Sequence, residues 1–391
     1  MNVTPLALHS PRAVGDALRS HGWETALADT AAEGIHSSAF HITGLDQGAL
    51  EALVQFVGGL GLEVVTGNDW AIVAGSRSRL SALARPWTVP EPLMQVAIGV
   101  GTALPQQRPT AWQTARGSVF LDRPVILGIL NVTPDSFSDG GQYTGLSAAL
   151  AHAENLLGSG ASILDIGGES TRPGRTTDVP EDEELRRVVP VVTELARRYP
   201  ELVISIDTVK AAVAKAAIDA GAAVVNDVSA LRLDSSMAHI VAAAGAGVIL
   251  MHSRGSILEL SSYRHTDYGG DVVGVVLSEL RDALATAIAA GIAPDATVID
   301  PGFGFSKTPE QNLLLFDQLA ALHSLDRPIL VGPSRKRFVG AATGVALEDR
   351  DRATAAACAL AYDRGARLFR VHDVAGARDT LALAQAVGSA A

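Results

Sequence analysis

The sequence predicts an α/β protein in which a small α/β domain precedes a (β/α)8 TIM barrel. Eight short apolar runs rich in Val and Ile recur after residue 124, and each is followed by an amphipathic, Ala-rich stretch of helical period. Continuous apolar runs are typical of parallel strands covered on both faces, and eight such units fill the ~250 residues of a closed barrel. All 4 tryptophans precede residue 113, so the composition changes near residues 105–120. We therefore predict a first domain at residues 1–108 and a second at residues 109–391.

The first domain is predicted to be a small α/β module. Residues 38–44 have the pattern of a short strand, and residues 47–58 have the period of a helix. Two more short strands are expected around LEVVTG and WAIVAG, because the Asn68-Asp69 pair between them favours a turn. The segment from Pro105 to Pro109 has the composition of a linker. No grouping of residues in this domain indicates a chemical activity.

The second domain is predicted to open with a hairpin at TAWQTARGSVFLD, followed by eight βα units. The predicted strands are residues 125–132, 161–168, 202–208, 222–229, 247–252, 297–302, 328–333 and 368–373. The predicted helices are residues 145–159, 181–198, 209–220, 234–244, 271–290, 309–323, 349–364 and 374–387. An open doubly wound sheet is the alternative architecture, but eight units of nearly equal length favour closure.

Composition excludes several classes of protein. The 391 residues carry 42 acidic and 31 basic side chains, a net charge of −11, so the chain has no overall electrostatic footprint for a nucleic-acid backbone. The single cysteine, Cys358, lies in an Ala-rich helical segment, which favours a buried structural residue in a reducing compartment. No apolar stretch reaches the length of a membrane span, and the first residues lack the pattern of a secretion signal. We expect a cytoplasmic protein without nucleic-acid or membrane partners.

Polar residues end or follow the predicted strands, at the face of a barrel where active sites lie. They are Asn131, Asp165, Asp207, Asn226, Asp227, His252, Asp300, Ser334, Arg335, Lys336, Arg370 and His372. One such residue is usually a helix cap or a turn former, but a polar position on each of eight strands is hard to explain by capping.

These residues fall into two chemical groups. Acceptor-rich or bifunctional side chains, Asp207, Asn226 and Asp300, suit a flat heterocycle with several N–H donors and ring acceptors. The cationic group, Arg335, Lys336, Arg370 and His372, suits an anion such as a phosphate. The predicted ligand is a polar heterocycle joined to a phosphorylated arm.

Two long loops follow the first two predicted strands. The first carries Phe137 and Asp139, and the second carries Thr171, Arg172 and Pro173. Their Gly and Pro residues are compatible with ordinary turns, but charged and aromatic side chains above a barrel mouth favour mobile lids that exclude water.

Seven segments of the second domain together resemble one known family. They are GILNVTPDSFSDGG (128–141), LDIGGESTRPG (164–174), SIDT (205–208), VNDVSAL (225–231), DPGFGFSK (300–307), GPSRK (332–336) and RVHDV (370–374). In this order, with one motif for nearly every strand end, they are similar to the dihydropteroate synthases of folate biosynthesis, from about residue 110 to the end. The first domain more loosely resembles the extension that some bacterial members carry. Two positions depart from the family: Ser253, where a methionine is more usual, and Ser306, where glycine is usual.

The resemblance implies a transferase that joins 6-hydroxymethyl-7,8-dihydropterin diphosphate to 4-aminobenzoate, with Mg²⁺ as cofactor and a homodimer as the assembly. It implies that the pterin is held by Asp207, Asn226, Asp300 and Lys336. It places Asn131, Thr171, Arg370 and His372 around the diphosphate, with Asn131 also contacting Mg²⁺. It places Thr171, Arg172, Pro173, Phe305 and Ser334 around the aminobenzoate, and Phe137 and Asp139 in the lid. Asp207, Lys336, Arg370 and His372 are then the expected catalytic residues.

The implied chemistry is ionisation of the C–O bond to the diphosphate, because an electron-rich dihydropterin stabilises the resulting cation. Mg²⁺, Arg370 and His372 would neutralise the leaving group, and Asp207 and Asp300 would favour the positive charge. The amine of aminobenzoate then needs mainly positioning. No covalent nucleophile is required.

Three other functions are weighed against this one. Methyltetrahydrofolate-dependent methyltransferases share a pterin-binding barrel but have no use for the STRPG loop or the cationic cluster. A Schiff-base aldolase using Lys336 is a second barrel chemistry, in which the acceptor group would have no role. The third is a non-catalytic pterin-binding scaffold, against which the intact loop residues argue.

Overall fold

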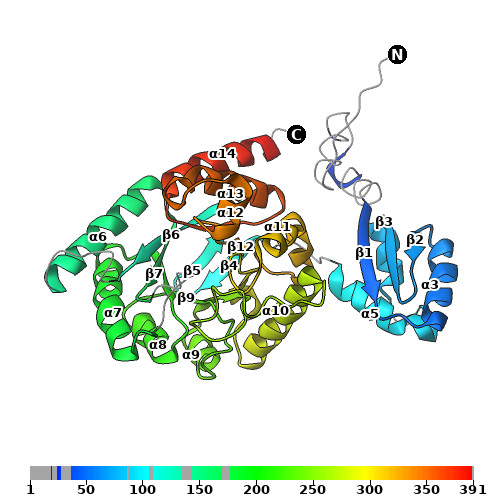
Figure 1. Cartoon of the computed structure of the whole chain (residues 1–391), viewed down its shortest axis with the longest axis horizontal. Coiled ribbons are helices and arrows are strands. Elements are labelled where there is room, and N and C mark those ends of the chain that lie inside the picture. Colours follow the sequence, from blue (N-terminus) through cyan, green and yellow to red (C-terminus); the bar gives the residue numbers. More distant parts are fainter. Residues whose placement is uncertain are drawn as a thin grey trace, which may run out of the picture. The chain divides into compact units, whose positions relative to one another are not determined.

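A computed structural model describes residues 19, 24–27, 37–85, 88–104, 109–133, 142–169 and 177–389. The chain forms two compact units, residues 1–106 and residues 107–388. Both units are drawn in Figure 1.

The first unit is a three-stranded antiparallel sheet with helices. Its strands β1 (Ser37–Thr43), β2 (Glu63–Thr66) and β3 (Trp70–Ser76) lie in the order β1-β3-β2. Its helices are α3 (Gln47–Gly59), α4 (Arg77–Leu83) and α5 (Met94–Ala103). Helix α3 begins where the Asp46 carboxylate accepts a hydrogen bond from the Ala49 amide. The predicted strands and helix of this module are therefore confirmed, with Leu53, Val57, Val73 and Leu80 in its core.

The second unit is built on eight parallel strands, as predicted. They are β6 (Val125–Asn131), β7 (Ile163–Gly167), β8 (Val203–Asp207), β9 (Val224–Asp227), β10 (Gly247–Met251), β11 (Thr297–Asp300), β12 (Leu330–Val331) and β13 (Leu368–Val371). Their order is β11-β10-β9-β8-β7-β6-β13-β12. A parallel bridge between Ile299 and Ile329 joins the two ends of this sheet, so it closes into a barrel and the open-sheet alternative is wrong.

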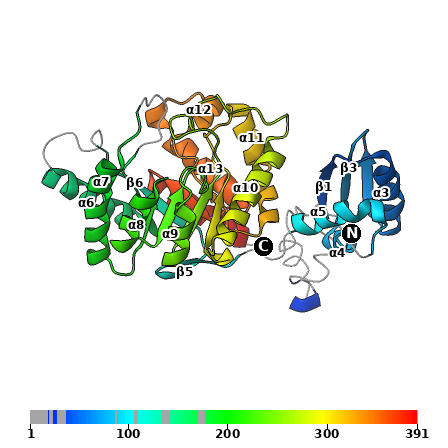
Figure 2. The ribbon, with the colours of Figure 1, turned by 90° about the horizontal axis from the view of Figure 1, so that it is seen from below.

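The helices surround the strands (Figures 1 and 2). They are α6 (Gln142–Ser159), α7 (Glu181–Arg198), α8 (Ala211–Asp219), α9 (Met237–Ala244), α10 (Val272–Ala289), α11 (Pro309–Asp317), α12 (Arg337–Thr343), α13 (Asp351–Asp363) and α14 (Val374–Ser389). Helix α11 is shorter than predicted, because residues 319–325 form a 3-10 helix. Helix α12, a short addition after β12, was not predicted because seven residues containing Gly340 give little helical signal.

The predicted hairpin is also present, at the N-terminal end of the barrel. Its strands β4 (Ala111–Thr114) and β5 (Gly117–Phe120) pair antiparallel. The Trp112 side chain is fully buried and donates its Nε1 hydrogen to the Ala296 carbonyl at 3.0 Å. It packs in one cluster with apolar side chains from the starts of the strands, among them Val125, Ile163 and Leu368. This end of the barrel is therefore filled, and a ligand must enter from the other end.

No helix in the described part of the chain is long and apolar enough to cross a membrane.

Candidate functional site

The polar residues predicted from the strand ends gather at the C-terminal end of the barrel. Asn131, Asp207 and Asp300 are the last residues of β6, β8 and β11. Asp207 is in register with Asn226 of β9, and Asn131 is in register with Gly167 of β7. Because neighbouring parallel strands place register partners side by side, the predicted set lies together.

Arg370 of β13 joins two carboxylates across the barrel. Its Nε donates to Asp165 Oδ2 at 2.5 Å, and one of its terminal nitrogens donates to Asp207 Oδ2 at 2.6 Å. The Asn226 amide also donates to Asp165 Oδ2, at 3.1 Å. Arg370 was predicted to face an anion, and it is in addition the counter-ion of these two acids.

Asp165 is a site residue for which we predicted no role from the sequence. Its side chain is fully buried and organises both Arg370 and Asn226. The signal that would have found it is its position: a carboxylate in the middle of an otherwise apolar strand needs a buried partner.

Burial shifts the ionisation of the three central groups toward neutrality. Burial raises the pKa of Asp207 to about 7; Arg370 opposes this shift, and the charge of Asp165 adds to it. Burial likewise raises the pKa of Asp300 to about 6, against the hydrogen bond from the Gly302 amide. Burial and the charge of Arg370 lower the pKa of Lys336 to about 7. The acids and the lysine therefore titrate close to neutral pH, where each can exchange a proton with a bound heterocycle.

Lys336 and Phe305 are in direct contact. The Lys336 ammonium lies 3.5 Å from the centre of the Phe305 ring. Phe305 belongs to an apolar cluster at the barrel mouth with Val209, Val228 and Met251. Ser253, where the family more often has a methionine, donates its hydroxyl hydrogen to the Val228 carbonyl of this cluster at 2.6 Å.

Ser334 and His372 are also brought together. The Ser334 hydroxyl lies 2.9 Å from His372 Nδ1, and the His372 backbone amide donates to the same hydroxyl at 3.2 Å. The hydroxyl oxygen accepts from the amide, and which of the hydroxyl and Nδ1 donates in their contact depends on the His372 tautomer.

Arg335 does not join the cationic group, so that part of the sequence prediction is wrong. Its guanidinium binds both carboxylate oxygens of Asp351 on α13, at 2.7 and 2.6 Å. Its backbone lies in the left-handed region, with a φ of 56°, and this conformation directs the Arg335 side chain toward α13. The sequence places Arg335 beside Lys336 but cannot show this turn.

Comparison with known proteins decides the family. Residues 127–372 match the profile of the pterin-binding enzymes. This chain belongs to that family. A dihydropteroate synthase of Mycobacterium leprae is 45% identical over 262 residues, which are 66% of this chain and 90% of that protein. One from Bacillus subtilis is 40% identical over 255 residues, covering 65% of this chain and 85% of the relative.

Solved structures of pterin-binding enzymes agree with the sequence relatives. A dihydropteroate synthase of Xanthomonas albilineans with 4-aminobenzoic acid matches with a TM-score of 0.67 and 45% identity, over 72% of this chain and 99% of that one. The enzyme from the same organism in complex with 7,8-dihydropteroate matches with a TM-score of 0.64 and 43% identity, over 72% of this chain and all (100%) of that one. The pterin-binding fold and the enzyme class, a transferase of folate synthesis, are therefore those of this chain.

Five predicted residues of the pterin-binding site lie outside the described part of the chain. They are Phe137 and Asp139 of the first loop and Thr171, Arg172 and Pro173 of the second. Their assignments stay predictions.

Two oxygen atoms of the site lie close to Gly167. If Gly167 carried a Cβ atom, it would lie 3.7 Å from Asn131 Oδ1 and 3.6 Å from Asp207 Oδ2. Within the described residues no group of three His, Cys, Asp or Glu side chains is arranged to hold a metal. The donors present fit a hard cation that keeps most of its waters, and they do not form a closed cage.

Proposed function

We propose that this chain acts as a dihydropteroate synthase, joining 6-hydroxymethyl-7,8-dihydropterin diphosphate to 4-aminobenzoate with release of diphosphate. The observation that carries the proposal is the gathering of Asp207, Asn226 and Asp300 with Lys336 and Arg370 at one barrel mouth. The relatives named above carry this activity in their names and match over 255 and 262 residues of this chain.

The pterin is held by the acceptor group and Lys336. Asp207, Asn226 and Asp300 offer carboxylate and amide oxygens to the N–H donors of the ring, and Lys336 offers a donor to a ring acceptor. The pKa values of Asp300 and Lys336, about 6 and about 7, allow a proton to be shared with the ring at low cost.

The diphosphate is met by Arg370 and His372, with Thr171 of the second loop and Asn131. Arg370, which binds the pterin acid Asp207, would also contact the anion, and His372, in contact with Ser334, would contact the leaving group. Asn131 would hold Mg²⁺, which would supply additional neutralisation of the leaving-group charge.

The reaction starts with cleavage of the C–O bond, and the electron pair leaves with the diphosphate. Asp207 and Asp300 stabilise the positive charge that spreads over the dihydropterin. The aminobenzoate amine forms the new C–N bond and then loses a proton to solvent or diphosphate. Phe305, Ser334, Thr171, Arg172 and Pro173 would orient the amine, and the loop with Phe137 and Asp139 would exclude water. Asp207, Lys336, Arg370 and His372 are the catalytic residues of this scheme.

The proposal extends to assembly and location: a homodimer in the cytoplasm. Neither a methyltetrahydrofolate-dependent methyltransferase nor a non-catalytic scaffold is favoured by an observation of this site, because both leave the Ser334–His372 pair and Arg370 without a role.

The test is an assay of the purified chain with dihydropterin diphosphate, 4-aminobenzoate and Mg²⁺, following diphosphate release and dihydropteroate formation. Product that requires both substrates supports the proposal. Diphosphate release that does not depend on aminobenzoate would contradict it.

A further inference from the structure

Lys307 is a buried lysine outside the group assigned to the substrates. It is only 2% exposed, at the end of the loop that follows β11. Its ammonium has three acceptors: His252 Nδ1 at 2.9 Å and the carbonyls of Gly302 and Phe305, both at 3.2 Å. Burying a cation without a carboxylate partner is costly, and burial lowers the pKa of Lys307 to about 7. A residue kept at such a cost needs a function that a small apolar side chain would not serve.

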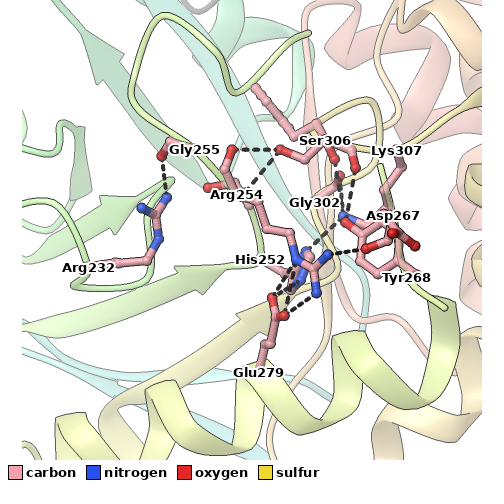
Figure 3. A network of polar contacts seen from close by, with 12 residues as sticks. Arg232, His252, Arg254, Gly255, Asp267, Tyr268, Glu279, Gly302, Ser306 and Lys307 are labelled. Atoms are coloured by element: carbon pink, nitrogen blue, oxygen red, sulfur yellow. Dashed lines mark hydrogen bonds and ion pairs between the residues drawn. The ribbon is translucent and has the colours of Figure 1, made fainter. Parts of the chain in front are cut away.

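The His252 ring is fixed from its other side by helix α10. His252 Nε2 lies 2.8 Å from a Glu279 carboxylate oxygen, and Arg254 binds the same carboxylate (Figure 3). Burial and the charge of Lys307 lower the pKa of His252 to about 4, so the ring is neutral at pH 7. A carboxylate can only accept, so the single ring proton is on Nε2 and Nδ1 is left as the acceptor for Lys307. Glu279 therefore selects the tautomer that Lys307 needs.

The carbonyls that Lys307 holds bracket the turn that carries Phe305. Gly302 has a φ of 69°, and a Cβ there would lie 1.9 Å from the His252 carbonyl oxygen, so this turn is closely packed on β10. Asp300 is anchored independently, because its carbonyl accepts from the His252 amide at 2.9 Å as an extension of the sheet. Phe305 has no such strand pairing: its amide donates to Gly302 O at 3.1 Å, within the same turn. The ring at the barrel mouth thus depends on Lys307 more than Asp300 does.

Ser306 adds a second tie to the same loop. It has a φ of 50°, which favours glycine, yet its hydroxyl accepts from the Arg254 amide at 3.0 Å and donates to the Arg254 carbonyl at 2.9 Å. The Tyr268 hydroxyl donates to the Ser306 carbonyl at 3.0 Å. Compared with glycine, Ser306 has fewer accessible backbone conformations, and its hydroxyl makes hydrogen bonds that glycine cannot make. Both differences stiffen the loop beside Phe305.

We propose that Lys307, oriented by His252 and Glu279, is a positioning residue that fixes the Phe305 ring and thereby the affinity for aminobenzoate. The proposal rests on the proposed function. It concerns a contact with the backbone, so Lys307 itself touches neither substrate.

The first experiment compares Lys307→Met with Lys215→Met, a matched control on α8 whose lysine side chain is 62% exposed. In Lys307→Met we expect the KM for aminobenzoate to rise about 10-fold, because a displacement near 1 Å of a positioning group has effects of this order or more. The KM for dihydropterin diphosphate should change less than ~3-fold, since Asp300 keeps its strand pairing. Equal increases of both KM values with a lower melting temperature would show a general structural role and overturn the proposal.

The second experiment uses Glu279, whose side chain is 37% exposed. Glu279→Ala removes the acceptor that selects the His252 tautomer, and we expect a rise of about 3-fold in the aminobenzoate KM. Glu279→Gln keeps an acceptor oxygen and should restore the original value. If product forms with the same aminobenzoate KM in every variant, the positioning role is wrong while the proposed function stands. If the unaltered chain forms no product, the proposed function itself is wrong.

Discussion

The two ends of the barrel are made from the same strands and have opposite characters. Side chains that point into a barrel are two residues apart along a strand, so Ile163 and Asp165 share one row, as do Leu368 and Arg370. The first member of each pair packs under Trp112, and the second joins the charged network. An apolar side chain of the core and a charged side chain of the site are therefore only two residues apart on the same strand. The apolar layer packs directly beneath the buried charges and supports them.

The largest expected effect concerns the charged end. Arg370→Ala removes the counter-ion of Asp165 and Asp207 together with the proposed anion contact, and we expect kcat/KM to fall about 10²–10³-fold. Binding of dihydropterin diphosphate should weaken far more than binding of a free pterin, as measured by calorimetry. Arg335→Ala is the control, because its guanidinium binds Asp351. Equal losses for both ligands would remove Arg370 from the diphosphate site.

The apolar end should affect stability instead of catalysis. Trp112→Ala leaves a large cavity under the strands, and we expect the free energy of unfolding to fall by about 3–5 kcal/mol. Both KM values should stay unchanged at temperatures where the variant is folded. Phe120→Ala in the same hairpin is the control, since its side chain is exposed. A selective rise of one KM in Trp112→Ala would mean that the two ends are coupled.

The pH dependence of kcat/KM should show the three ionisable groups of the charged end. Activity should rise as pH increases through about 6 and about 7, where Asp300 and Asp207 ionise, and fall above about 7, where Lys336 loses its proton. The sign for stability is the reverse for the acid: the contribution of neutral Asp300 is complete below the unfolded pKa of ~3.9 and is lost as pH rises through about 6. Lys336→Arg should move the alkaline limb upward; a limb that stays at its pH does not belong to Lys336.

The smallest effect is expected at Phe305, where an apolar cluster meets the charged residues of the barrel mouth. Phe305→Leu keeps an apolar side chain but loses the ring that faces Lys336, and we expect the aminobenzoate KM to rise about 10-fold, at least as much as in Lys307→Met, which acts through this ring. Phe316→Leu, in the core between barrel and helices, serves as the control for loss of an aromatic ring. An unchanged aminobenzoate KM in Phe305→Leu would remove this residue from the pocket.

The sequence predicted the barrel well because strand order follows chain order in βα units. The eight apolar runs, and helix α7 to the residue, are confirmed, since their pattern is local. The sequence predicted which polar residues lie at the strand ends, but it did not predict which of them form hydrogen bonds or ion pairs with one another. Arg335 and Lys336 are neighbours in sequence, and only the left-handed backbone at Arg335 sends one to Asp351 and the other to Phe305. We predicted no role for Asp165 or for the His252–Lys307 pair, because their roles depend on contacts between strands and loops that are distant in the sequence.

The barrel closes between β11 and the short strand β12, and we call this junction the seam. Strand β12 has two residues, and its link to β11 includes the one parallel bridge at Ile299 and Ile329. Fewer ladder bonds mean a lower free energy for local opening, so amides along this seam should exchange with deuterated water before those of β7 and β8. Asp300 and Ser334 lie on opposite sides of this seam. A ligand that contacts both residues would hold β11 and β12 together and slow that exchange.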